Sequence, residues 1–483
     1  MIHPSRLAVV IIATVLTAVL AYFGTGLHPL WALLWLAPIP ILFVAQGLRP
    51  LSVFFVSSLA WLIGELSQWN YFTRILGIPV PIALLFLVIP AFLFSLGVLF
   101  TRSFFLRQSP ILAALAFPVY WVGWEYLSAI SSPHSTFGNL GYSQMNCLPL
   151  IQIASITGIW GLSFLVFLFA STTAVLLTGI GRPLSRRVLA FGTSALLCAV
   201  FAFGEWRLAT RPDGQSVMVT LIAKDVPMSA YLGSEEQAIR LFADYANEIT
   251  RVTPVGTQVV VLPEKIGRVK EKTLPQIDAL FAAAATAARS AIDLGLVRLT
   301  PSGGYNSSRF YSAEGKVTAN YDKHHLLPGI EPERPGHERV TLDQASGRWG
   351  FQVCKDMDFP QLSREYAGDG AGFLLVPAWD FVADGWLHAR MAALRAVENG
   401  FVLARCARNG LLTLVDNRGR IIAEKPTKSG QFVSLTGKLT VTNEKTFYGQ
   451  AGDWFAWLCV ATFVILLGYR LLPARRPTGW EPA

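Results

Sequence analysis

Long apolar runs with at most one charged residue constrain this chain most, because a helix needs about 20 apolar residues to cross a bilayer. Eight such runs occur, at 7–23, 30–45, 53–69, 82–100, 111–130, 156–180, 188–203 and 454–472. The composition agrees, since 53% of the 483 residues are hydrophobic and only 15% are charged. The first run lacks a small-residue cleavage site and a second run follows at once, so it is not expected to be a removable signal peptide. We therefore predict a polytopic membrane protein with eight transmembrane helices.

The arginines of the short connections predict how these helices are oriented. Cytoplasmic connections usually carry the excess of Lys and Arg. If the N-terminus lies inside, the inner side carries ten arginines, including Arg475 and Arg476 of the tail, and the outer loops carry only Arg74. Seven crossings then place the segment after Glu205 on the outer face, and the eighth returns the tail to the cytoplasm. The net charge of +9 thus reflects topology, and we expect no nucleic-acid partner.

The segment 206–452 has the composition of an ordinary globular domain and is long enough for its own core. Strands are predicted at 217–222, 259–262, 373–376, 402–406, 411–415 and 420–423, with three more before residue 322, and helices at 234–250, 274–292, 360–366 and 386–399. Alternating strands and helices are typical of an α/β layered fold. The predicted domains are a seven-helix membrane domain (1–205), the α/β domain (206–452), and an eighth helix with a cytoplasmic tail (453–483).

Three residues with catalytic chemistry each come directly after a strand-like run: Glu264, Lys323 and Cys354. A cysteine becomes a nucleophile as thiolate, which requires a nearby cation, base or helix N-terminus. Taken singly, Cys354 reads as a small buried hydrophobe and the other two as solvated strand-end charges. Their common position predicts one catalytic set. No nucleotide-binding or zinc-binding spacing occurs, so we expect no cofactor or metal.

The motifs around these residues resemble the nitrilase, or carbon–nitrogen hydrolase, superfamily. They are Val-Val-Val-Leu-Pro-Glu ending at Glu264, Tyr-Asp-Lys-His-His-Leu-Leu-Pro around Lys323, and Val-Cys at Cys354. Further matches follow at His388, Met391, Arg395, Glu398, Asn399, Arg405, Asn409, Asp416 and Gly419. In the membrane half, Gly-Tyr-Ser-Gln at 141–144 and Gly-Asp-Trp at 452–454 are similar to the bacterial apolipoprotein N-acyltransferase family. The whole chain resembles that family over nearly its full length.

The resemblance implies a polytopic α-helical membrane domain joined to an extracytoplasmic nitrilase-like α-β-β-α sandwich. It also implies a ping-pong acyltransferase in which Cys354 attacks, Glu264 is the general base and Lys323 stabilises the oxyanion. The acyl chain would pass from a membrane phospholipid, through a thioester, to the N-terminal amine of a diacylglyceryl-cysteine lipoprotein. The implied location is the inner membrane, with the catalytic domain on the periplasmic face. Glu331 matches a further site residue of the family and either positions Lys323 or is solvated.

Some positions depart from the family pattern. In the family they shape the pockets for the acyl chain and the amine, so the departures leave the predicted catalytic residues intact. Lys355-Asp356 replace the usual Tyr-Glu after the nucleophile, and Trp379-Asp380-Phe381 replace the usual Asn-Asp-Ala-Trp. A tryptophan commonly follows the loop after the first strand in the family, and Tyr231-Leu232 occupy that region here. These departures leave the role of Asp356 and the identity of the acceptor amine open.

Two other functions therefore remain open besides acyl transfer to a lipoprotein or to a different amine. One is a membrane-anchored nitrilase-type amidase, in which water takes the acyl group, and the other is a catalytically silent lipid-binding relative. His324 and His325 are expected to make structural hydrogen bonds. Glu125 is expected to pack or meet a lipid headgroup near the outer surface. The sequence assigns no role to Glu65, no motion to the segment 329–347 and no oligomeric state.

Overall fold

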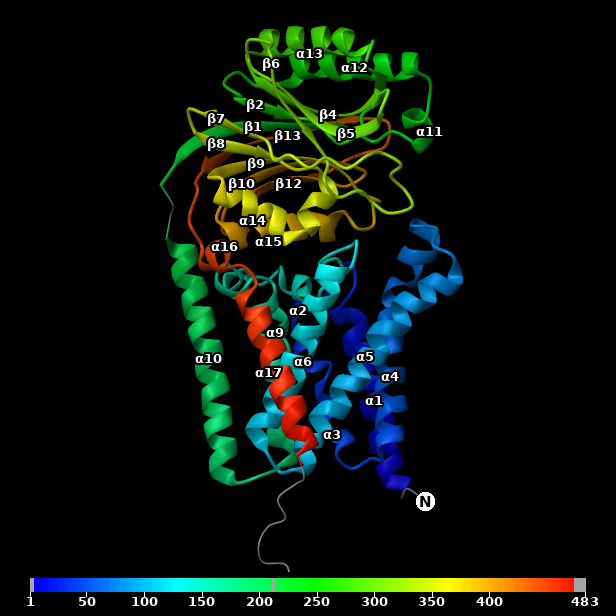
Figure 1. Ribbon diagram of the computed structural model, residues 1–483, viewed down its shortest axis with the longest axis vertical. Coiled ribbons are helices and arrows are strands. Elements are labelled where there is room, and N and C mark those ends of the chain that lie inside the picture. The colour runs from blue at the N-terminus through cyan, green and yellow to red at the C-terminus, as the bar shows by residue number, and fades with distance from the viewer. Residues whose placement is uncertain (1–3, 211–212, 473–483) are drawn as a thin grey trace, which may run out of the picture.

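The chain forms a bundle of helices with a layered α/β domain stacked on one end of it (Figure 1). This computed structural model describes residues 4–210 and 213–472. The predicted tail, with Arg475 and Arg476, lies outside the described residues. Both connections between bundle and domain are at the same end, because α10 leads into the domain and α17 leads out of it (Figure 1).

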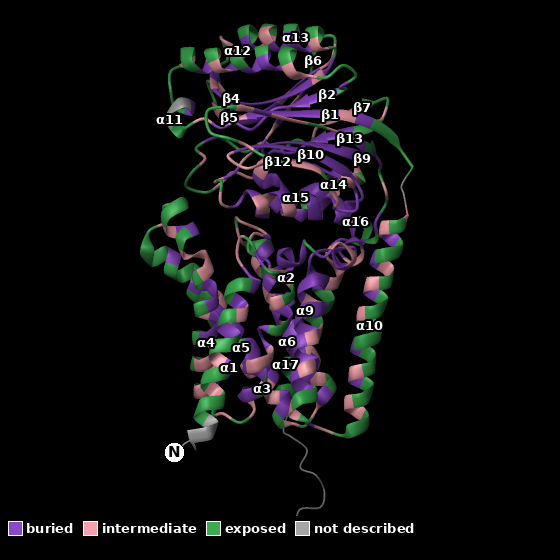
Figure 2. Cartoon of the chain, turned by 180° about the vertical axis from the view of Figure 1, so that it is seen from behind, coloured by how far each residue is buried: buried purple, intermediate pink, exposed green. Residues whose placement is uncertain are grey.

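Seven of the helices in the described residues are long and apolar enough to cross a membrane, which confirms seven of the eight predicted spans. They are α1 (Pro4–Gly24), α4 (Pro50–Glu65), α5 (Val80–Leu106), α6 (Pro110–Ser131), α9 (Trp160–Thr178), α10 (Pro183–Ala209) and α17 (Trp454–Leu471). Their outward faces expose many large apolar side chains (Figure 2). Such a surface is stable only against lipid, so the bundle is a membrane domain.

The run 30–45 was predicted as one continuous span, and this prediction was wrong. It forms two short helices, α2 (Trp31–Leu36) and α3 (Ile39–Ala45). Pro38 and Pro40 cause the break, because each lacks a backbone N–H donor. The pair still crosses the bundle, with α2 near the domain and α3 at the far end (Figure 1). Arg102 near the far end of α5 donates to the carbonyl of Ala45 at 2.9 Å. Together with the seven long helices, this pair gives the described part of the chain eight crossings of the bundle.

Two sheets face each other in the α/β domain. The first has the order β13 (Phe432–Val441), β1 (Gln215–Lys224), β2 (Val259–Val261), β4 (Ala291–Thr300), β5 (Gly303–Tyr311), β6 (Val317–Asp322), with β3 (Arg268–Lys270) beside β4. The second has the order β12 (Ile421–Pro426), β11 (Leu411–Val415), β10 (Val402–Arg408), β9 (Ala371–Trp379), β8 (Gly347–Phe351), β7 (Thr341–Gln344).

Helices cover the outer face of each sheet (Figure 1). The first sheet is covered by α12 (Glu235–Val252) and α13 (Leu274–Ala288), and the second by α14 (Pro360–Gly368) and α15 (Gly385–Asn399). This is the expected α-β-β-α sandwich. The remaining short helices are α7 (Leu148–Ile151), α8 (Ala154–Thr157), α11 (Met228–Tyr231) and α16 (Phe447–Ala451).

The predicted start of α12 is confirmed, whereas the predicted end of α13 is wrong, and each has a local cause. Ser234 caps α12 as predicted, since its hydroxyl accepts from the backbone of Gln237 and the Gln237 side chain accepts in return. The helix predicted at 274–292 is too long. It ends at Ala288 because Arg289 adopts a left-handed conformation with φ of 51°, and Ala291 already starts β4.

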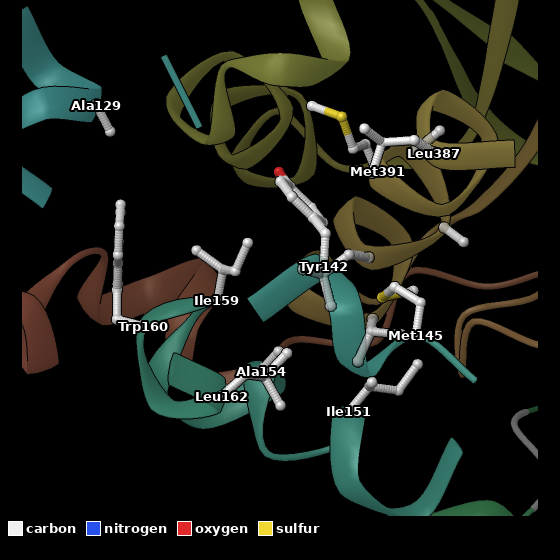
Figure 3. Packing of buried hydrophobic residues seen from close by; sticks show 14 of the residues in the cluster. Ala129, Tyr142, Met145, Ile151, Ala154, Ile159, Trp160, Leu162, Leu387 and Met391 are labelled. Atoms are coloured by element: carbon white, nitrogen blue, oxygen red, sulfur yellow. The ribbon is translucent and has the colours of Figure 1, made fainter. Parts of the chain in front are cut away.

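The second helical layer of the domain rests on the loops of the bundle. Leu387 and Met391 of α15 pack with Tyr142 in one hydrophobic cluster (Figure 3). Arg395 donates to the Tyr142 hydroxyl at 2.9 Å. Glu125 is buried in the bundle and accepts from the backbone N–H of Leu140 at 2.9 Å, so it has the packing role that was one of its two expected roles.

Candidate active site

Two strands of the first sheet deliver the predicted base and lysine to one edge. β2 runs parallel to β4, and β4, β5 and β6 are antiparallel in turn, so β2 and β6 point the same way. Glu264 follows β2 and Lys323 follows β6 directly. Cys354 follows β8 of the facing sheet and begins a 3-10 turn that ends at Asp358. The backbone N–H of Glu264 donates to the carbonyl of Ala378 in that sheet at 3.3 Å, which joins the two halves.

Glu264 and Lys323 form a buried ion pair. The Lys323 Nζ lies 2.9 Å from Glu264 Oε1, and both residues are 2% exposed. Asn306 of β5 donates to the same carboxylate oxygen at 2.5 Å. Burial works against the lysine charge, but the carboxylates of Glu264 and Glu331 outweigh it and raise the pKa of Lys323 well above its ordinary value. The ammonium is therefore charged at neutral pH.

Glu331 lies between two lysines and is not solvated. Its carboxylate is 2.8 Å from Lys323 and 2.8 Å from Lys265, and it accepts from Asn306 at 2.9 Å and from the backbone of Leu327 at 2.7 Å. Burial opposes its charge, but the two lysines hold its pKa at about 2. Glu331 is therefore in place to orient Lys323.

The sequence reasoning missed Lys265, Asn306 and Glu333. Lys265 is 2.9 Å from Glu333, whose other oxygen accepts from the Tyr231 hydroxyl at 3.3 Å. Lys265 has a left-handed backbone, with φ of 53°, which few non-glycine residues adopt. Adjacency to Glu264 was the one available signal for Lys265. Asn306 lies within a strand, and nothing in its neighbourhood marks it in the sequence.

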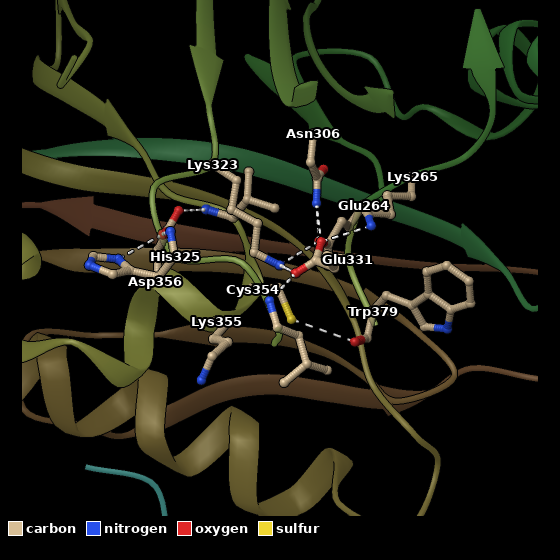
Figure 4. A network of polar contacts seen from close by, with 12 residues as sticks. Glu264, Lys265, Asn306, Lys323, His325, Glu331, Cys354, Lys355, Asp356 and Trp379 are labelled. Atoms are coloured by element: carbon tan, nitrogen blue, oxygen red, sulfur yellow. Dashed lines mark hydrogen bonds and ion pairs between the residues drawn. The ribbon is translucent and has the colours of Figure 1, made fainter. Parts of the chain in front are cut away.

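The Cys354 thiol lies beside this ion-pair network (Figure 4). Its backbone is also left-handed, with φ of 46°, and its Sγ donates to the carbonyl of Trp379 at 3.5 Å. Burial raises the pKa of Cys354 well above its ordinary value, and the charge of Glu264 adds to this while that of Lys323 opposes it. A raised pKa favours the protonated thiol, so the predicted nucleophilic role of Cys354 would require a base.

Asp356 anchors the turn that begins at the nucleophile. Oδ1 accepts from the backbone N–H of His325 at 2.9 Å and lies 3.1 Å from its Nδ1, and Oδ2 accepts from the backbone of Val353 at 3.0 Å and from Tyr321 at 2.7 Å. Burial opposes the charge of Asp356, but His325 lowers its pKa below the ordinary value. His324 makes its own contact, with the Glu338 carbonyl at 3.1 Å. The expected hydrogen bonds of both histidines are thus present.

The residues that replace the family pattern lie around this network. Asp380 forms a buried bidentate pair with Arg405, at 2.9 and 2.5 Å. Lys355 points away from the ion-pair network (Figure 4) and lies 3.4 Å from Asp358 and 3.5 Å from His134 of the membrane half. Within the described residues no group of three or more His, Cys, Asp or Glu side chains could hold a metal ion.

Two family models match the chain, one in each half. Residues 15–172 match the apolipoprotein N-acyltransferase N-terminal domain, and residues 225–437 match the carbon-nitrogen hydrolase family. Among solved structures, the chain is similar to Nit3 from Saccharomyces cerevisiae, with a TM-score of 0.39 and 22% identity over 47% of this chain and 92% of that one. A carbon-nitrogen hydrolase from Helicobacter pylori gives a TM-score of 0.41 and 18% identity, over 50% and 94%.

Curated relatives extend over both halves. An apolipoprotein N-acyltransferase from Geobacter metallireducens is 27% identical over 92% of this chain and 91% of that protein. One from Vibrio vulnificus is 28% identical over 86% of each, and one from Haemophilus ducreyi is 24% identical over 95% and 97%. Both models and these relatives agree, so the chain is similar to the apolipoprotein N-acyltransferase family over nearly its full length.

Proposed function

We propose that this protein moves a fatty acyl chain from a membrane phospholipid to the N-terminal amine of a diacylglyceryl-cysteine apolipoprotein. Acylation of lipoproteins is the activity in the names of its relatives. The observation that carries the mechanism is the buried Glu264–Lys323 ion pair beside the Cys354 thiol. These three side chains supply a base, a cation and a nucleophile within one site.

In the first half-reaction, the Cys354 sulfur attacks the ester carbonyl of the phospholipid while Glu264 takes the thiol proton. Negative charge develops on the carbonyl oxygen, and the Lys323 ammonium stabilises it. The tetrahedral intermediate collapses with loss of the glycerol oxygen, which receives the proton back from Glu264. The products are a lysophospholipid and an acyl thioester on Cys354.

In the second half-reaction, the free amine of the lipoprotein attacks the thioester. Glu264 accepts a proton from the amine, Lys323 again holds the oxyanion, and the thiol leaves as the amide forms. A thioester is reactive enough for this step, so neither half-reaction requires an external energy source. Binding both lipid substrates next to one thiol supplies proximity, and the two tethers α10 and α17 keep the domain at the membrane.

We also propose that the α/β domain faces the periplasm from the inner membrane. Eight crossings with an inside N-terminus support this, because the arginine-rich connections then lie in the cytoplasm. The domain would then face the outer leaflet, in which the lipoprotein substrates are anchored.

Intact-mass measurement of the purified protein with phospholipid tests the proposal. The expected result is a fatty-acyl adduct on Cys354 that a synthetic diacylglyceryl peptide discharges with formation of an N-acylated peptide. Cys354→Ala is the control and should show no adduct. Hydrolysis of small amides, with no acyl transfer to the peptide, would instead support the amidase alternative. An unacylated wild-type protein under all conditions would contradict both half-reactions.

A further inference from the structure

Arg408, at the end of β10, carries a buried charge with no ion-pair partner among the described residues. It is 1% exposed, and its Cζ stacks 3.3 Å above the ring centre of Trp379. The Tyr231 ring lies on it as well, with its centre 5.6 Å away. Nη1 donates to the Lys265 carbonyl at 3.2 Å, but Nε and Nη2 are buried and have no hydrogen-bond partner. Three of the five N–H donors of this guanidinium, one on Nε and two on Nη2, therefore have no partner.

The two free donors lie along the same edge of the guanidinium plane. Nε–H and Nη2–H are parallel there and match the spacing of two oxygens of a phosphate or carboxylate. Arg405, three residues earlier on the same strand, shows the contrasting case, because Asp380 accepts from both its Nη1 and its Nη2. The free edge of Arg408 thus has the geometry of a bidentate anion site.

The charge balance around Arg408 points the same way. Burial lowers its pKa to about 10, and the charges of Glu264 and Asp225 reach it without forming an ion pair. It therefore remains a cation at neutral pH. An isolated buried cation is costly for a folded protein unless an anion offsets it.

The position relative to the nucleophile identifies the anion. Trp379 links the two, because its carbonyl accepts from Cys354 and its ring stacks on Arg408. In a glycerophospholipid one glycerol unit joins the reactive ester to the phosphate, so the two groups of one donor molecule need neighbouring sites. We propose that the Nε–Nη2 edge of Arg408 binds the phosphate group of the phospholipid that donates the acyl chain. This inference rests on the proposed function, and it concerns a residue outside the Glu264, Lys323 and Cys354 set.

Tyr231 has to move for a phosphate to reach this edge. It ends the four-residue helix α11, and Met228 at the start of that helix and Leu232 directly after it are 47% and 59% exposed. Within residues 4–210 and 213–472, its hydroxyl makes one hydrogen bond, to Glu333 at 3.3 Å. An outward shift of α11 would uncover Arg408 without breaking either sheet.

The test compares two acyl donors that carry the same fatty acid, phosphatidylglycerol and a neutral p-nitrophenyl ester, each presented in detergent micelles. The full-length protein is studied as wild type, as Arg408→Gln and as Arg408→Lys, with Arg348→Gln as an arginine control on the surface. The rate of acylation of Cys354 is measured by intact mass. We expect Arg408→Gln to slow acylation by phosphatidylglycerol about 10- to 100-fold, the usual effect of losing a charged hydrogen bond, and acylation by the neutral ester less than about twofold.

Arg408→Lys should retain only part of the rate at which phosphatidylglycerol acylates Cys354, because lysine keeps the charge but lacks two parallel N–H donors. The thermal midpoint of Arg408→Gln should stay at or above that of the wild type, since no carboxylate loses a partner. Equal slowing with both donors, or no slowing with either, would overturn the inference while leaving the acyltransferase intact. If neither donor acylates the wild type, the proposed function itself fails.

A second arm separates lipid phosphate from free phosphate. Inorganic phosphate at millimolar concentration is added to the wild type and to Arg408→Gln, and thermal unfolding is recorded. We expect no phosphate-dependent shift of the thermal midpoint in either protein, because the Nε–Nη2 edge of Arg408 becomes accessible only when the lipid donor binds. A shift confined to the wild type would make Arg408 a site for free phosphate and would overturn the assignment to the donor.

Discussion

Replacing Glu331 by glutamine tests whether this residue acts through Lys323. The change keeps the size of the side chain but removes the charge that both Lys323 and Lys265 contact at 2.8 Å. The two lysines hold the Glu331 pKa at about 2 instead of 4.5, which corresponds to about 3 kcal/mol of folding free energy. Breaking a buried ion pair from one side typically costs about 3–5 kcal/mol. We therefore expect the thermal midpoint to fall by roughly 6–12 °C.

The catalytic consequence follows from the ammonium geometry. Without Glu331, Lys323 keeps only Glu264 as a carboxylate partner and no longer has a fixed direction, so the acylation rate of Cys354 should fall about 10- to 100-fold. Glu333→Gln is the matched control, because Glu333 contacts Lys265 and Tyr231 but not Lys323. It should destabilise the protein yet slow acylation less than about threefold. The reasoning is refuted if both variants slow acylation equally, or if Glu331→Gln keeps wild-type stability.

The pH dependence of this pair has a defined sign. The folded pKa of Glu331 is lowered, so its contribution is fully present above pH 4.5 and is lost as the pH falls through about 2. The stability difference between wild type and Glu331→Gln should therefore shrink below pH 4.5, as followed by thermal unfolding at a series of acidic pH values.

Three further predictions concern the junction and the outer layer. Burial lowers the pKa of His388, but Asp384, at 3.3 Å, and Asp358 outweigh it and raise that pKa from 6.5 to about 9. The contribution of His388 to folding stability is therefore complete below pH 6.5 and is lost as the pH rises through 9. Thermal unfolding of His388→Gln should lack this alkaline loss. Tyr71→Phe removes the 2.7 Å hydrogen bond to Asp384 and should cost about 1 kcal/mol in denaturant unfolding; unchanged stability would mean that this contact does not hold the domain. Ser234→Ala removes the N-cap of α12 and should also cost about 1 kcal/mol, with acylation of Cys354 unchanged.

The sequence predicted the layers of the fold because each rests on a local pattern. Long apolar runs predicted seven spans correctly, and period-two and helical segments predicted most strands and helices of the sandwich. The pattern failed where a distant partner decides the structure. β13 was not predicted, since its residues become a strand by pairing with β1 over their whole length, from Gln215 with Val441 to Lys224 with Phe432. The break at Pro38 was missed because the hydropathy of the run hides it.

The candidate site divides in the same way. Glu264, Lys323 and Cys354 could be found because strand ends deliver functional side chains to one edge, and this is visible in sequence. Asn306 could not be found, because its importance comes from contacts across strands, where it joins Glu264 to Glu331. Lys265 offered one signal, its adjacency to Glu264. Buried polar side chains of this kind look like ordinary strand and loop residues until the fold brings them together.

Lys323 also explains why the site tolerates its departures from the family pattern. A lysine ammonium has three donors, and Glu264 and Glu331 engage two of them, so one is left for a substrate oxygen. None of the side chains that differ from the family pattern contacts the Lys323 ammonium. Asp356 anchors the turn, Lys355 points away, and Trp379 holds the thiol through its backbone carbonyl, which any residue could supply. The chemistry can thus be kept while the surfaces that select the donor and the amine change.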